Sequence, residues 1–169
     1  MKNILTFILL LFTMQASSQE FNKKLTDESG NVLSLINRCT REGLFSYPEM
    51  KERYDLEYPG YTPDSNTIEA LKPMIKDIHV TIVLGTWCGD SKLQVPHFYK
   101  VMDALKVSEK DISIIAVDRS KHAENGLLDG LNILRVPTFI ITDKKKELGR
   151  IVEFPEETLE KDLLSILKK

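Results

Sequence analysis

The sequence predicts an α/β fold with one central mixed sheet flanked by helices. Apolar, β-branched runs alternate with amphipathic stretches through the second half of the chain, as strands and helices do around a single sheet. A chain of 169 residues suits one domain with a substantial core. We divide the chain into a leader at 1–18, an N-terminal extension at 19–77 that packs on the core, and a main domain at 78–169.

The first 18 residues have the layout of a secretory signal peptide. Lys2 is their only charged residue, an apolar stretch runs from Ile4 to Met14, and small residues follow at 16–18. The apolar stretch is shorter than the about 20 residues that a helix needs to span a bilayer. We therefore expect an exported mature protein that starts near Gln19 and has no stable membrane anchor.

The N-terminal extension is expected to contain one strand and two helices, with a loop between the helices. Val32–Cys39 carries β-branched and apolar residues, which predict a strand. Ser46 is placed to cap a helix that has Pro48 in its first turn and fades near Asp55. The remaining expected elements are a loop at 58–66 and a short helix at 67–76.

The second half of the chain predicts a regular alternation of strands and helices. The expected elements are strand 79–85, helix 89–106, strand 112–118, a helical stretch around 123–131, strand 138–142, strand 148–153 and helix 156–167. The order of strand, helix, strand, helix, hairpin and closing helix describes an α/β arrangement around one sheet.

Cys88 lies where an apolar strand passes into a helix. The first turn of a helix offers unpaired amides and the positive end of the helix dipole, and both favour a thiolate. Ser91 lies one helical turn further on, so its hydroxyl is placed to donate a hydrogen bond to the sulfur. Lys92 adds positive charge nearby, and Asp90 opposes it.

Ser91 occupies the position that would complete a Cys-x-x-Cys redox pair. A thiolate attacks a disulfide to form a mixed disulfide, which a second cysteine would then release. A serine cannot do this, so the adduct must wait for a thiol of the substrate, a small molecule or a second protein. This favours isomerisation, reversible capping or partner capture over simple oxidation or reduction.

Other designs of the site fit the sequence less well. A Cys–His dyad needs hydrogen-bond contact, but His97 lies about 13 Å beyond Cys88 along the same helix. His79 is at the far end of the preceding strand, and His122 reads as a solvated loop residue. No spacing suits zinc, so we expect no metal and no cofactor. Cys39 is expected to be buried and structural rather than bridged to Cys88.

With these residues in hand, the chain resembles the thioredoxin superfamily over about residues 78–169. The matching features are Trp87-Cys88-Gly89, Pro96 in the following helix, and Arg135-Val136-Pro137-Thr138 before the hairpin. The resemblance implies a thioredoxin-like fold in which Pro137 is cis and faces Cys88. It also implies that Trp87 partly covers the sulfur, that Val136 pairs with a bound peptide through its backbone, and that Gly89 and Asp90 contact the substrate.

The sequence departs from the thioredoxin pattern at two positions. Ser91 replaces the second cysteine, and Ile82 stands where thioredoxins carry a buried acid. The Cys-Gly-x-Ser pattern is also similar to monothiol glutaredoxins, although Trp87 and the leader count against that family. The segment 87–92 looks like that of an exported thioredoxin-like group of bacteria, which implies a periplasmic or extracellular location.

Asp118 and Arg119 end a strand that is expected to run parallel to the strand before Cys88. The carboxyl ends of both strands then meet at one edge of the sheet, where open α/β sheets bind ligands. Arg119 is expected to orient a substrate or to favour the thiolate. The alternative is an ion pair in a solvated loop, and the sequence leaves both open.

Two classes of function remain. The first is a thiol–disulfide oxidoreductase or isomerase without a resolving cysteine, whose partners are exported proteins with thiols or disulfides and an external thiol reductant. The second is a non-catalytic module that binds a peptide or protein beside Trp87 and Pro137, with Cys88 incidental. The net charge of −2 argues against nucleic acid as a partner.

Overall fold

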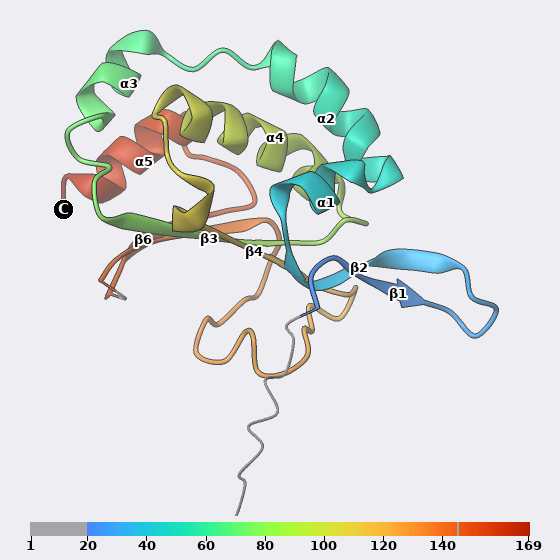
Figure 1. The fold of residues 1–169 in the computed structure, drawn as a ribbon. Coiled ribbons are helices and arrows are strands. Elements are labelled where there is room, and N and C mark those ends of the chain that lie inside the picture. The colour runs from blue at the N-terminus through green and yellow to red at the C-terminus, as the bar shows by residue number, and fades with distance from the viewer. Residues whose placement is uncertain (1–19, 145) are drawn as a thin grey trace, which may run out of the picture.

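A six-stranded mixed sheet in the order β1-β2-β4-β3-β5-β6 forms the centre of the protein (Figure 1). The computed structural model describes residues 20–144 and 146–169, and the expected leader at 1–18 lies outside them. The strands are β1 (Lys23–Thr26), β2 (Val32–Cys39), β3 (Ile78–Leu84), β4 (Ile112–Ala116), β5 (Thr138–Asp143) and β6 (Lys146–Val152). β3 and β4 are parallel, and the other neighbouring pairs are antiparallel.

The α-helices lie over one face of this sheet, and the segment 117–137 runs below the other face (Figure 1). The helices are α1 (Arg41–Ser46), α2 (Pro48–Gly60), α3 (Ser65–Leu71), α4 (Gly89–Ala104) and α5 (Leu159–Leu167), with a short 3₁₀ turn at Glu109–Asp111. Within the described residues, no helix combines the length and the apolar character needed to cross a membrane.

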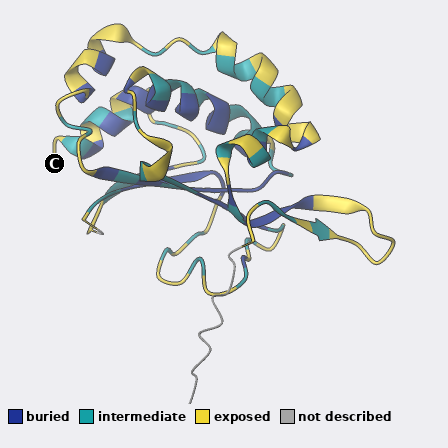
Figure 2. Cartoon of the chain, viewed as in Figure 1, coloured by how far each residue is buried: buried dark blue, intermediate teal, exposed yellow. Residues whose placement is uncertain are grey.

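Two apolar clusters pack on opposite faces of the sheet. Successive side chains of a strand point to opposite faces, so Ile82 and Leu84 join the larger cluster under the helices while Val83 joins the smaller one. Cys39 belongs to the larger cluster, and Cys88 packs against the smaller one. Figure 2 shows that buried residues concentrate in the sheet and on the sides of α4 and α5 that face it.

Most of the predicted elements are confirmed. β2 has the predicted bounds, and β3, β4, β5, β6, α4 and α5 form where their sequence patterns indicate, with shifted ends. α2 continues to Gly60 instead of fading near Asp55, so the expected loop 58–66 is reduced to the residues between α2 and α3. β1 and α1 were not predicted.

The helix predicted around 123–131 is wrong. Asn125, Gly126 and Gly130 adopt positive φ angles of 56°, 68° and 76°, which a right-handed helix does not contain. The segment instead forms successive tight turns, such as the one in which the amide of Asp129 donates to the carbonyl of Gly126 at 3.0 Å. Glycine and asparagine adopt this left-handed conformation at low cost, so these residues break the helix.

Candidate active site

Cys88 is the N-cap residue of α4, at the edge where the parallel strands β3 and β4 end. Its backbone is extended, with φ −88° and ψ 127°, and its amide donates to the carbonyl of Gly85 at 2.9 Å. Its own carbonyl accepts from the amide of Lys92 at 3.1 Å, which is the first bond of the helix. The side chain is partly exposed and is not in a disulfide. The fold thus presents a free thiol to solvent at a helix N-terminus.

Trp87 is fixed beside this thiol by a hydrogen bond and by close packing. Its indole Nε1 donates to the carbonyl of Val117, just after β4, at 2.9 Å. The ring lies so close to Gly85 that a Cβ atom there would come within 2.5 Å of the indole Cε2. Gly85 is therefore needed for the ring to lie where it does, and any larger residue would displace Trp87 from the site.

The chain before β5 completes the other side of the site. The Val136–Pro137 peptide bond is cis, and the thiol of Cys88 donates to the carbonyl oxygen of Val136 at 3.3 Å. The carbonyl of Pro137 accepts from the amide of Glu153, which follows β6, at 2.8 Å. The structure therefore brings together Cys88, Trp87 and the Val136–Pro137 segment.

Ser91 does not lie as the sequence predicted. Its side chain is fully buried, and its hydroxyl oxygen accepts from the amide of Gly85 at 3.3 Å. Among the contacts of the described residues, the Cys88 thiol bonds to Val136, and the expected hydrogen bond from Ser91 to the sulfur is not formed. The reason is that the loop before α4 folds back over the first helical turn and supplies the amide that Ser91 binds. Ser91 therefore holds the loop that carries Cys88.

The charged residues of the first turn of α4 also differ from expectation. Lys92 forms an ion pair with Glu49 of α2, so its charge is directed toward α2. Asp90 is partly exposed and Gly89 is exposed, which leaves both open to a bound partner. The ion pair thus joins the first turn of α4 to the start of α2.

The loop after β4 is organised by Asp118. Its Oδ1 accepts from the amides of Ser120 at 2.8 Å and His122 at 2.9 Å, and these bonds close a tight turn. The expected alternative, an ion pair between Asp118 and Arg119, is not formed in the described part of the chain. The guanidinium carbon of Arg119 instead lies 5.3 Å from the centre of a Trp87 ring.

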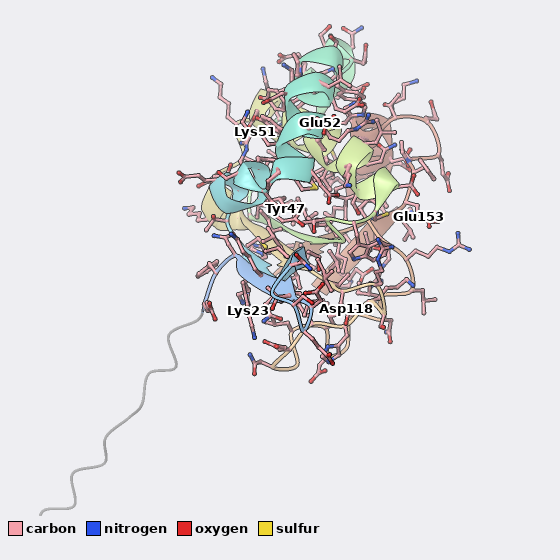
Figure 3. All side chains as sticks on the ribbon, turned by 90° about the vertical axis from the view of Figure 1, so that its right-hand side faces the viewer. Lys23, Tyr47, Lys51, Glu52, Asp118 and Glu153 are labelled. Atoms are coloured by element: carbon pink, nitrogen blue, oxygen red, sulfur yellow. The ribbon has the colours of Figure 1, made fainter. Side chains whose placement is uncertain are left out.

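Tyr47 and Thr86 are residues of the site that sequence reasoning missed. Burial, with a contribution from Glu49, raises the pKa of Tyr47, and a hydrogen bond with Thr86 opposes this shift. Thr86 is fully buried, and its hydroxyl oxygen accepts from the amide of Leu35 in β2 at 3.1 Å. Figure 3 shows Tyr47 below α2 and Asp118 further down. The N-terminal segment thus packs directly against the loop that carries Cys88.

The second cysteine has a different environment. Cys39 is 5% exposed, and burial raises its pKa to about 12. Its thiol donates only a long bond, 3.7 Å, to the carbonyl of Asn37. Both cysteines are free, so the disulfide between them is absent from the structure. Within the described residues, no group of three or more His, Cys, Asp or Glu side chains is arranged to hold a metal ion.

The sheet order, the helix that starts at Cys88 and the Val136–Pro137 segment beside it define a thioredoxin-like protein. The chain belongs to the thioredoxin family, whose sequence model matches residues 42–164. This range begins within α1, so it includes helices that the sequence analysis assigned to an N-terminal extension. A thioredoxin-like domain indicates a redox or thiol-related role in general.

A solved structure shares this fold. A protein of unknown function from Pseudomonas aeruginosa is 15% identical, and the match covers 76% of this chain and 91% of that one with a TM-score of 0.54. Mitochondrial thioredoxin 3 from Saccharomyces cerevisiae is 23% identical, and the match covers 57% of this chain and 86% of that one with a TM-score of 0.34. No curated protein matches the chain.

Proposed function

We propose that this is an exported monothiol protein that exchanges thiols and disulfides with other exported proteins through Cys88. One observation carries the proposal. The Cys88 thiol is partly exposed at the start of α4 and lies 3.3 Å from the Val136 carbonyl, whereas the other cysteine is buried in the cluster on the opposite face. The leader at 1–18 supports export.

The first step forms a mixed disulfide. The Cys88 thiolate attacks one sulfur of a partner disulfide, the partner's S–S bond breaks, and its other sulfur leaves as a thiolate. The unpaired amides of the first turn of α4 stabilise the attacking thiolate. Loss of the thiol proton also ends the bond from Cys88 to Val136, so the Val136 carbonyl becomes free to accept from a backbone amide of the partner.

The second step needs a thiol from outside the protein, because Ser91 has no sulfur and Cys39 is buried. A thiolate of the same partner can attack its own sulfur in the adduct, so that Cys88 leaves as a thiolate and the partner's disulfides are rearranged. Alternatively, a small thiolate attacks Cys88 Sγ and the partner leaves as a thiolate. A second small thiol then frees Cys88 and departs as a small-molecule disulfide.

Refolding of a secreted test protein with scrambled disulfides measures this activity. We expect the mature protein to accelerate the rearrangement and to form an adduct that mass spectrometry maps to Cys88. The Cys88→Ser variant should lose both, and Cys39→Ala, the matched control, should keep both because Cys39 is remote from solvent. If wild type forms no more adduct than Cys88→Ser, the proposal is wrong and a non-catalytic binding module becomes the better explanation.

A further inference from the structure

Arg119 places an unpaired cation at the site. The residue is exposed, and its guanidinium carbon lies 5.3 Å from the centre of a ring of Trp87, the neighbour of Cys88. Among the described residues it takes part in no ion pair. An exposed arginine beside an aromatic ring and with no carboxylate partner is suited to bind an anion.

The surrounding charges explain why Arg119 has no partner. The adjacent acid, Asp118, uses its Oδ1 to accept two backbone amides of its own turn. Two other cations around the site are already paired: Lys92 with Glu49, and Arg135 with Glu153 at 2.6 Å. Arg119 is therefore the cation next to Trp87 whose charge the described carboxylates leave uncompensated.

The position of Arg119 leaves its hydrogen-bond donors available. Trp87 is itself held by its bond to the Val117 carbonyl and by its contact with Gly85, so the ring is a rigid support. A guanidinium placed over an aromatic ring is attracted by the negative face of the ring. Its N–H donors point outward in the guanidinium plane, where they match the two oxygens of a carboxylate.

We propose that Arg119 binds the carboxylate of a small thiol that resolves the Cys88 mixed disulfide. The resolving molecule is thus of the class of carboxylate-bearing thiols, and this inference rests on the proposed function. With its carboxylate on Arg119, the incoming thiolate attacks Cys88 Sγ, the bond from Sγ to the partner's sulfur breaks, and the partner leaves as a thiolate. A second molecule of the thiol then frees Cys88.

Three small thiols of different charge test this inference. The Cys88 thiol of the full mature protein is first joined to thiopyridine, an uncharged chromophore. The rate of its release is then measured with mercaptoacetate (anionic), mercaptoethanol (neutral) and cysteamine (cationic). Each thiol is compared only with itself in wild type and variant, so differences in intrinsic nucleophilicity cancel.

Arg119→Gln should slow mercaptoacetate about five-fold, the effect of one Coulombic contact near 4 Å in water. Mercaptoethanol should change by less than about two-fold, and cysteamine should react faster than with wild type. In wild type, about 1 M salt should lower the release rate with mercaptoacetate toward the rate of Arg119→Gln, because the electrostatic screening length falls to about 3 Å. Lys161→Gln is the matched control: this cation is in α5, where it is paired with Glu157, and all three rates should equal those of wild type.

The outcomes separate this inference from the proposed function. If Arg119→Gln slows all three thiols by the same factor, the residue acts on Cys88 itself, and the carboxylate site is wrong. If no adduct forms at Cys88, or if none of the three thiols releases it, the proposed function fails and this inference fails with it.

Discussion

Cys39 and Cys88 have the same side chain but lie in two different environments of the molecule. Cys39 is in the middle layer, at the end of β2 under the helices, where burial raises its pKa to about 12. Burial therefore keeps the Cys39 thiol protonated near neutral pH. Cys88 is the N-cap residue of α4 at the edge of the sheet, partly exposed and beside the unpaired amides of the first helical turn. The difference shows that the position in the fold decides which thiol is available for exchange.

A second thiol inside the site should give the largest change in the rate at which a mixed disulfide on Cys88 is released. Ser91→Cys would place a sulfur one helical turn from Cys88, within the reach of a disulfide. We expect it to release a Cys88 mixed disulfide internally, at least about ten times faster than wild type without added thiol. Stopped-flow measurement of thiopyridone release gives the rate.

Ser91→Ala is the matched control for this variant. It removes the acceptor of the Gly85 amide, which costs about 1 kcal/mol of stability, but adds no thiol. The Cys88 adduct should therefore remain as long-lived as in wild type. An equally long-lived adduct in Ser91→Cys would mean that position 91 does not face the sulfur closely enough to resolve it.

A smaller effect is expected in the helical layer. Glu160 accepts from the Tyr61 hydroxyl at 2.6 Å and from the Asp64 amide at 3.0 Å. Burial raises the pKa of Glu160, but these bonds outweigh burial and lower it overall. A carboxyl whose folded pKa is below its unfolded value of about 4.3 stabilises the fold above that pH. This contribution is lost as the pH falls through the folded pKa.

Glu160→Gln should therefore lower the free energy of unfolding by about 1 kcal/mol at pH 7. The difference from wild type should shrink as the pH falls from 7 through the folded pKa of Glu160, because the carboxyl is then protonated in both states. Urea denaturation at a series of pH values measures it. The reaction of Cys88 should be unchanged, because Glu160 belongs to α5 in the helical layer. If the difference in the free energy of unfolding persists at low pH, the charge of Glu160 is not what stabilises this contact.

Much of the fold could be predicted from the sequence because its signals are local. β3 is a run of β-branched residues that ends before Gly85, and α4 carries Phe98 and Met102 on its buried face. The approach of Cys88 to Val136 came from the resemblance, since no local pattern joins residues 48 positions apart.

The parts that could not be predicted depend on contacts between distant segments. The pattern at 123–131 is helical in its apolar spacing, but Asn125 and Gly126 adopt left-handed conformations, and Ala123 and Leu127 pack in the smaller cluster. The hydroxyl of Ser91 binds an amide of the folded-back loop, and the charge of Lys92 is directed to α2. Each of these outcomes requires the tertiary structure that the sequence pattern does not contain.

The stoichiometry of the reaction with dithiodipyridine shows whether Cys88 reacts as a single thiol that no group of the chain resolves. Native wild-type protein should release one equivalent of thiopyridone per chain, and mass spectrometry should find one adduct, on Cys88, that persists until a thiol is added. Cys39 should react only after denaturation. Two equivalents from the native protein, with Cys39 and Cys88 joined in a disulfide, would contradict the account, because the adduct would then be resolved from within the chain.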